Sequence, residues 1–250
     1  MVKVLLLGGT GEARELAAMA ERASGFEIIS ALAGRTTAPR LPSGAVRIGG
    51  FGGSAGLREW LVANEIEAVV DATHPFAATI SAHAATAAAA LGLPLLHLRR
   101  PGWVSVAGDH WIRVPDRLAA VRALRDQGER IFLTIGRQGV ADFAELTGWF
   151  LIRAIDPPTG PLPARHELLL ARGPFTVADE AALLARRRID AVVTKDSGGA
   201  ATEAKLIAAR AAGITVVLID RPALPEGARV VSDAKQAWEW LCSGAFEHLG

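Results

Sequence analysis

Several residue types that mark common protein classes are scarce or missing in this chain of 250 residues. Its single cysteine, Cys242, excludes an internal disulfide and a cluster of cysteine metal ligands, and no metal site is predicted. No apolar run reaches the ~20 residues that a membrane-spanning helix needs, and no leader pattern opens the sequence. A net charge of +1 argues against nucleic-acid binding through bulk charge. We therefore expect a cytoplasmic protein without nucleic-acid or membrane partners.

What the sequence does contain is an internal repeat. Each half has an apolar strand, a helix rich in small residues, a second apolar strand and an Arg-Pro step. These pieces are Ile66–Val70, Gly92–Leu96 and Arg100-Pro101 in the first half, and Ile189–Val193, Gly213–Val217 and Arg221-Pro222 in the second. Two similar strand–helix units imply two similar domains with a cleft between them.

Short apolar runs alternate with helix-compatible segments in both halves, which is typical of parallel strands covered by helices on both faces. Strands are predicted at Val2–Leu7, Phe26–Leu32, Ala68–Asp71, Pro94–Leu98, Ile131–Ile135, Trp149–Ala154, Ala191–Thr194 and Thr215–Ile219. Helices are predicted at Glu12–Ala23, Ala55–Asn64, Ala77–Leu91, Val140–Leu146, Val177–Arg187, Ala201–Ala212 and Asp233–Leu241. The fold class is therefore α/β, with two Rossmann-like (flavodoxin-like) parallel-sheet domains related by the repeat.

The junction between the two domains is placed within residues 100–128, which gives an N-terminal domain of residues 1–115 and a C-terminal domain of residues 116–250. The elements predicted there are two strands and a helix, at Trp103–Val106, Trp111–Val114 and Asp116–Arg125. By the repeat, Trp111–Arg125 corresponds to Ala228–Leu241 at the C-terminus. Strands in these positions could pair with either sheet, so strand exchange between the domains stays open.

The first predicted strand runs directly into a glycine-rich turn that opens a helix. Glycine lets the backbone approach a pyrophosphate, and a helix N-terminus offers free N–H groups and a partial positive charge. The pattern is G-x-G-x-x-R, because Arg14 replaces the third glycine of the dinucleotide fingerprint, and no Gly-Lys-Ser/Thr follows to make a P-loop. A tight turn without a ligand is the alternative to dinucleotide binding by Gly8, Gly9, Thr10, Gly11, Glu12 and Arg14.

The end of the second strand indicates which dinucleotide is bound. NAD sites place a carboxylate there for the ribose 2′-hydroxyl, but no Asp or Glu occurs between Glu27 and Glu59. Arg35, Thr36 and Thr37 stand there instead, and a guanidinium matches the extra phosphate of NADP, unless it is a solvated loop arginine. Gly50, in the glycine-rich stretch Gly49–Gly53, is a further candidate contact for NADPH.

The fourth strand ends in Asp71-Ala72-Thr73-His74-Pro75-Phe76, at the sheet edge where doubly wound folds bind ligands. Thr73 and His74 are therefore predicted to lie beside the nicotinamide. His74 is either a group that donates a proton or lines the site, or a residue that caps the following helix.

In the second half the polar residues at these turns have changed. Arg137-Gln138 stands where the first half has Gly9-Thr10, and Lys195-Asp196-Ser197, followed by Gly198, stands where it has Ala72-Thr73-His74. Guanidinium groups bind carboxylates bidentately, so this half is predicted to bind an acidic substrate, with structural salt bridges as the alternative. The predicted substrate-binding residues are Arg137, Gln138, Arg172, Lys195, Ser197 and Gly198.

At these residues the chain resembles the precorrin-6A reductase family of vitamin B12 biosynthesis. The matching strings are Leu5–Arg14, Asp71–Phe76, Gly136–Gly139, Arg172–Phe175, Thr194–Gly199 and the helix with Glu203 and Lys205. The resemblance implies two Rossmann-like domains, NADPH in one, and a tetrapyrrole ring precursor in the cleft. It also implies NADPH-dependent reduction of one ring CH–CH double bond of precorrin-6A to give precorrin-6B, with hydride added at one carbon and a proton at its neighbour.

The residues agree with this resemblance but leave alternatives. The acetate and propionate arms of such a macrocycle need basic partners, which Arg137, Arg172 and Lys195 supply. Candidate proton donors are His74, Asp196 and Lys195, and a bound water competes equally. The absence of tyrosine argues against the short-chain dehydrogenases, which use a catalytic tyrosine. A two-domain sensor without redox activity is the other alternative, and a monomer or small homo-oligomer is expected.

Overall fold

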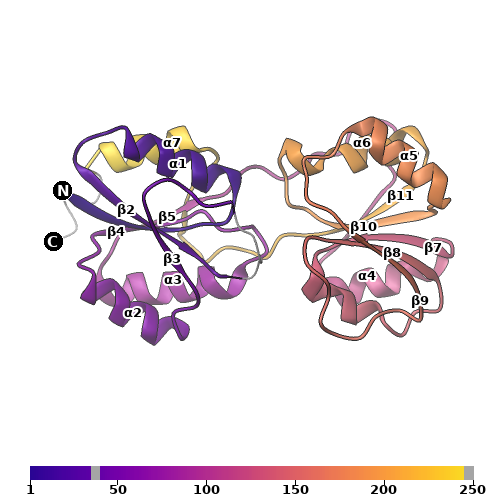
Figure 1. Ribbon diagram of the computed structural model, residues 1–250, viewed down its shortest axis with the longest axis horizontal. Helices are drawn as coiled ribbons and strands as arrows, with labels where there is room; N and C mark the ends of the chain where they lie inside the picture. Colours follow the sequence, from indigo (N-terminus) through magenta and orange to yellow (C-terminus); the bar gives the residue numbers. More distant parts are fainter. Residues whose placement is uncertain (35–39, 245–250) are drawn as a thin grey trace. The chain divides into compact units, whose positions relative to one another are not determined.

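The computed structural model describes residues 1–34 and 40–244 of the chain. The chain divides into two compact units, one formed by Met1–Pro101 with Ala223–Gly250 and the other by Gly102–Pro222. Each unit has a six-stranded parallel sheet with helices on both faces (Figure 1). This confirms the predicted α/β architecture of two parallel-sheet domains. In the described ranges, no helix is both long and apolar enough to cross a membrane.

The sheet of the first unit has the strand order β12-β5-β4-β1-β2-β3. Its strands are β1 (Val2–Leu7), β2 (Phe26–Leu32), β3 (Ala45–Ile48), β4 (Ala68–Asp71), β5 (Leu95–Leu98) and β12 (Arg229–Val231). Its helices are α1 (Gly11–Glu21), α2 (Gly53–Ala63), α3 (Ala78–Leu91) and α7 (Ala234–Cys242). Helices α1 and α7 pack together over one face of the sheet, and α2 and α3 over the other (Figure 1).

Alternating side chains of β1 build both layers of the core in this unit. Val4 and Leu6 pack in the cluster that contains residues of α1 and α7, whereas Leu5 and Leu7 pack in the cluster that contains residues of α2 and α3. All four are almost fully buried, which explains why β1 is a continuous apolar run without polar alternation.

The second unit repeats this plan with the strand order β6-β11-β10-β7-β8-β9. Its strands are β6 (Trp111–Val114), β7 (Arg130–Thr134), β8 (Trp149–Ala154), β9 (Arg165–Leu170), β10 (Ala191–Lys195) and β11 (Thr215–Ile219). Its helices are α4 (Arg117–Ala123), α5 (Val177–Arg187), α6 (Ala204–Ala211) and the 3₁₀ segments η1 (Leu124–Asp126), η2 (Arg137–Phe143) and η3 (Ala200–Thr202).

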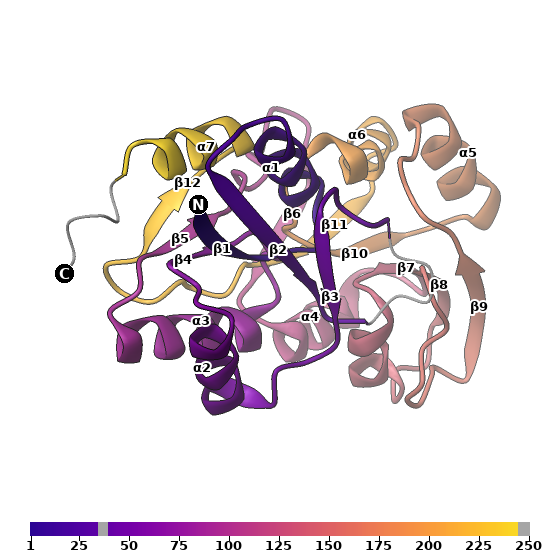
Figure 2. The ribbon, with the colours of Figure 1, turned by 60° about the vertical axis from the view of Figure 1, so that its left-hand side comes forward.

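The outermost strand of each sheet is exchanged relative to the order of the chain. β12, from the C-terminus, pairs with β5 of the first unit, whereas β6, which follows β5 in sequence, pairs with β11 of the second (Figure 2 shows β12 beside β5). The chain therefore passes between units at Pro101-Gly102, after β5, and at Pro222-Ala223, after β11. The first crossing lies within the predicted junction of residues 100–128, and the strand exchange that the sequence left open adds a second crossing, which contiguous domains of residues 1–115 and 116–250 would not have.

Three local predictions also differ from the structure. Residues 103–106 form no strand, because the Trp103 amide donates to the Asp196 carboxylate instead of to a neighbouring strand. The helix predicted at Val140–Leu146 is the 3₁₀ segment η2, which begins earlier. Strand β9 was not among the predicted strands, since its sequence, Arg-His-Glu-Leu-Leu-Leu, is half polar.

Candidate functional site

The turn between β1 and α1 combines open backbone with a fastened side chain. Gly9 has φ +114°, and a Cβ added there would meet no atom within 4 Å. Thr10 is the N-cap of α1: its hydroxyl accepts from the Ala13 amide at 3.2 Å and donates to the Ala72 carbonyl, on the segment after β4, at 2.7 Å. The Thr10 side chain therefore fixes the turn, while the glycine backbone stays accessible to a ligand.

Glu12 and Arg14 lie in the first turn of α1, close to these glycines. The Glu12 carboxylate accepts from Arg100 at 2.8 Å. Burial would raise the pKa of Glu12, but its backbone hydrogen bond and the Arg100 guanidinium outweigh burial and lower the pKa. A guanidinium nitrogen of Arg14 lies 3.8 Å from the Cβ position of Gly11. Glu12 is therefore held by a protein cation, and Arg14 adds positive charge beside the turn.

The loop after β3 is shaped by Arg47. Its guanidinium donates to the carbonyls of Gly49 at 2.6 Å and Gly50 at 2.8 Å, and it stacks 4.0 Å from the ring centroid of Phe51. A Cβ added at Gly50 would meet no atom within 4 Å. The loop thus presents open glycine backbone from a fixed frame. The predicted phosphate ligands Arg35, Thr36 and Thr37 lie outside the described residues.

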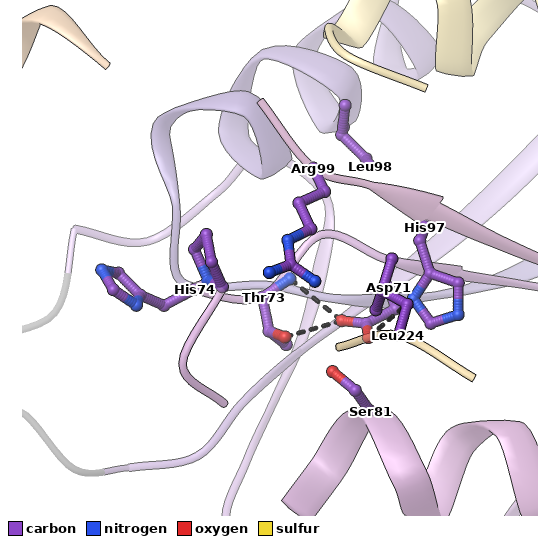
Figure 3. A pocket seen from close by; sticks show the side chains of 9 residues that line it. Asp71, Thr73, His74, Ser81, His97, Leu98, Arg99 and Leu224 are labelled. Carbon is purple, nitrogen blue, oxygen red and sulfur yellow. Dashed lines mark hydrogen bonds and ion pairs between the residues drawn. The ribbon is translucent and has the colours of Figure 1, made fainter. Parts of the chain in front are cut away.

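At the ends of β4 and β5 a buried carboxylate organises a small pocket (Figure 3). Asp71 and His97 are register partners on these strands, and His97 Nδ1 lies 3.2 Å from Asp71 Oδ2 with both side chains 3% exposed. Asp71 also accepts from Thr73, at 3.1 Å from the amide and 2.7 Å from the hydroxyl. Burial would raise the pKa of Asp71, but hydrogen bonds from His97, Ser81 and Thr73 outweigh it and lower the pKa.

Thr73 and His74, both predicted cofactor contacts, have different surroundings in this pocket. Thr73 is fastened to Asp71, whereas His74 is exposed and its ring points away from that carboxylate (Figure 3). His74 Nδ1 accepts from the Phe76 amide at 3.2 Å. The backbone of the next turn therefore holds the His74 ring at Nδ1.

In the second unit, β7 and β10 are neighbours, so the turns that follow them meet at one sheet edge. This brings Arg137 and Gln138 close to the segment Lys195–Gly198, whereas Arg172 follows β9, two strands beyond β7. Val4 pairs with Ala68 in the first sheet, and Ile131 pairs with Ala191, the repeat equivalent of Ala68, in the second sheet. Val4 is therefore equivalent to Ile131, and by the same count Thr10 is equivalent to Arg137. The predicted alignment of Gly9-Thr10 with Arg137-Gln138 is therefore off by one residue.

Asp196 binds residues from both ends of the second unit. Its carboxylate accepts from the Trp103 amide at 3.0 Å and from Arg113 at 3.0 Å, and Arg221 Nη2 lies 3.6 Å from Oδ1. Arg221 also donates to the Asp196 carbonyl at 2.7 Å. Since Trp103 and Arg221 lie next to the two chain crossings, this buried carboxylate fastens the first and last segments of the unit.

The family model of precorrin-6x reductase CbiJ/CobK matches residues 3–242. The chain belongs to the precorrin-6x reductase family. The matched range includes both units, the exchanged strand β12 and every residue assigned above to a candidate site.

Relatives in this family match the chain over nearly their whole length. A precorrin-6A reductase of Rhodococcus erythropolis is 56% identical over 242 residues, which cover 96% of this chain and 98% of the relative. A cobalt-precorrin-6A reductase of Priestia megaterium is 26% identical over 237 residues, covering 90% and 92%. The solved structure of a CobK precorrin-6A reductase has a TM-score of 0.89 and 46% identity, and covers 97% of each chain.

Sequence reasoning missed two buried polar clusters of this family member. The sequence predicts Asp71 only as the end of a strand and gives His97 no role, although a lone histidine in an apolar strand next to a strand that ends in Asp is a usable signal. In the second unit Arg153 and Glu180 form a buried ion pair near the buried Lys205. Among residues 1–34 and 40–244 no group of three or more acidic, histidine or cysteine side chains is placed to hold a metal.

Proposed function

We propose that this protein is a cytoplasmic NADPH-dependent reductase that converts precorrin-6A into precorrin-6B in vitamin B12 biosynthesis. The observation that carries this proposal is the family match over residues 3–242, together with the open glycine turn at α1. The metal-free ring is favoured because the relative named for it is 56% identical, against 26% for one named for the cobalt form.

In this proposal the first unit binds NADPH, and its described residues fit such a ligand. Gly9 and Gly50 leave open space over the backbone, and the N-terminus of α1 offers amides to a pyrophosphate. Arg35, with Thr36 and Thr37, would bind the extra phosphate, and Thr73 with His74 would line the nicotinamide. When bound, NADPH would supply a hydride to one carbon of the ring double bond, and a proton would add to the neighbouring carbon. The products would be the reduced CH–CH bond and NADP⁺.

The second unit would bind the carboxylate arms of the tetrapyrrole through Arg137, Gln138, Arg172, Lys195, Ser197 and Gly198. These donors orient the ring, since hydride transfer requires reacting carbons held roughly 3–3.5 Å apart. His74, Lys195 or a bound water would deliver the proton. Asp196 is a further candidate from the sequence, but the Trp103 amide, Arg113 and Arg221 surround its carboxylate, so we assign it an anchoring role.

Cofactor selectivity tests the proposal. Fluorescence titration should give tighter binding of NADPH than of NADH, and Arg35→Ala should remove most of that difference. Arg125→Ala, at an exposed arginine of the second unit, is the matched control and should change neither affinity. Precorrin-6A should then gain two hydrogens by mass as NADPH is consumed. Negligible binding of both nucleotides would instead support the two-domain sensor.

A further inference from the structure

A lysine that the proposed mechanism does not use lies buried in the second unit. Lys205 is in the first turn of α6 and is only 3% exposed. Burying a charged group is costly unless partners compensate for the lost water. Lys205 Nζ donates to the Thr202 carbonyl at 2.5 Å and lies 5.0 Å from the centroid of the Trp103 ring. Thr202 lies in η3, just before α6, whereas Trp103 lies in the segment that enters the unit, so the lysine joins two distant parts of the chain.

The Thr202 contact bears on the loop that follows β10. The hydroxyls of Thr202 and Ser197 lie 3.1 Å apart, so the two residues close the loop between them. Inside it, Gly198 and Gly199 have φ +61° and +80°, a region that glycine enters without strain. Glycines give the loop no stiffness of its own. The shape of the glycine segment before η3 therefore depends on the contacts that hold Ser197 and Thr202, and Lys205 supplies one of the contacts of Thr202.

The Trp103 contact leads to the other end of the same loop. The Trp103 amide donates to the carboxylate of Asp196, the residue just before Ser197, at 3.0 Å. Lys205 thus contacts Thr202 directly at one end and the ring of Trp103, which is tied to Asp196, at the other. A cation over an indole ring is attracted most strongly where water is excluded, as it is here.

We propose that Lys205 is a positioning residue that holds the loop from Ser197 to Thr202 in its shape. This rests on the proposed function in one respect, which is that Ser197 and Gly198 would contact the polycarboxylate substrate. A lysine suits this role because its ammonium serves both as a hydrogen-bond donor and as a cation for the ring.

The charges around Lys205 make this contact sensitive to pH. Burial and, to a smaller extent, the positive charge of Arg153 on β8 lower the pKa of Lys205 to about 7, against the opposing effect of Glu180 on α5. α6 also packs on β11, which has no charged residue over Thr215–Ile219. The ammonium is therefore present below about pH 7 and is lost above it, and its attraction to Trp103 is lost with it.

Amide hydrogen exchange of the full-length protein tests the proposal without any substrate. In peptides covering residues 196–203, Lys205→Met should exchange about tenfold faster than the wild type at about pH 6, after correction for intrinsic rates. The wild type should approach the rate of the variant at about pH 8.5. Lys235→Met, at an 80%-exposed lysine of α7, is the matched control and should behave as the wild type.

Unchanged exchange of this loop in a folded Lys205→Met variant would overturn the proposal. If that variant does not fold, the wild-type pH series decides: its tryptophan fluorescence should titrate near pH 7, and Trp103→Phe should remove that transition. If neither the tryptophan fluorescence of the wild type nor the exchange rate of this loop changed with pH, the role of Lys205 would be refuted. A wild type that binds NADPH but leaves precorrin-6A unreduced would count against the proposed function alone.

Discussion

At the scale of single residues, many polar side chains near the sheet edges hold the backbone in place by hydrogen bonds. Thr10 caps α1 and reaches Ala72, Thr73 is bound to Asp71, and Asp196 is surrounded by donors. Residue type and position along the chain identified these places as polar turns. They did not distinguish side chains that face a ligand from those that hold the turn, because that depends on contacts between segments far apart in sequence.

Among the predicted substrate-binding residues, Arg137 and Lys195 give the sharpest expectation. Replacing either with Ala should weaken macrocycle binding about tenfold or more, because a charge-assisted hydrogen bond to a carboxylate is lost. NADPH affinity should stay within about twofold, since both residues lie in the second unit. Steady-state kinetics and nucleotide titration measure the two effects. A fall in NADPH affinity without a change in KM for the macrocycle would contradict the assignment of ligands to units.

The Asp71–His97 pair gives a pH-dependent prediction. The pKa of Asp71 is lowered from its usual 3.8, so its ionised form stabilises the fold above about pH 4, and that stability is lost as the pH falls through the lowered pKa. Asp71→Asn should cost about 1–3 kcal/mol at neutral pH, because His97 and Thr73 lose a charged acceptor. The difference from the wild type should shrink below about pH 4 in urea unfolding series. A difference that is constant with pH would refute it.

At the scale of elements, the strong periodic segments could be predicted and the irregular ones could not. The buried strands β1, β2, β4, β7, β8, β10 and β11 lie within a residue of their predicted bounds, because two covered faces demand a continuous apolar run. Strand β9 was not predicted, because a strand at the edge of a sheet does not need a continuous apolar run. The segment η2 was predicted as an α-helix, because a 3₁₀ segment has the same composition as a short α-helix.

Two nearby glycines, one in the loop before α2 and one in the first turn of α2, separate the needs of the fold from those of ligand binding. A Cβ at Gly56, in the first turn of α2, would collide with the Phe51 carbonyl oxygen, whereas one at Gly50 would meet nothing within 4 Å. Gly56→Ala should therefore cost about 1–3 kcal/mol in the free energy of unfolding. Gly50→Ala should leave unfolding unchanged and weaken NADPH binding, if the nucleotide backbone passes there. Thermal unfolding and NADPH titration of both variants check this, and equal stability losses would contradict it.

At the scale of the whole molecule, the two sequence repeats and the two structural units do not coincide, because each repeat contributes its last strand to the sheet of the other unit. The repeat pairs Trp111–Arg125 with Ala228–Leu241, and the structure places the first segment in the second sheet and the second segment in the first sheet. The two sheets thereby keep matching strand orders. Sequence alone could not decide between this arrangement and contiguous domains, because β6 and β12 occupy equivalent edges next to strands of similar sequence.

This exchange makes the C-terminal helix part of the N-terminal unit, which can be tested by a pair of core substitutions. Trp240 on α7 is 6% exposed and packs with Val4 and Leu16 in the core of the first unit. Trp240→Ala should cost about 3–5 kcal/mol and should raise hydrogen exchange in β1, β4 and β5 rather than in β7 and β10. Leu124→Ala, which removes a 4%-exposed side chain after α4, is the reciprocal control and should loosen β7, β10 and β11 instead. If Trp240→Ala loosened the second sheet first, the C-terminal segment would belong with the strands that precede it in the chain, as contiguous domains require.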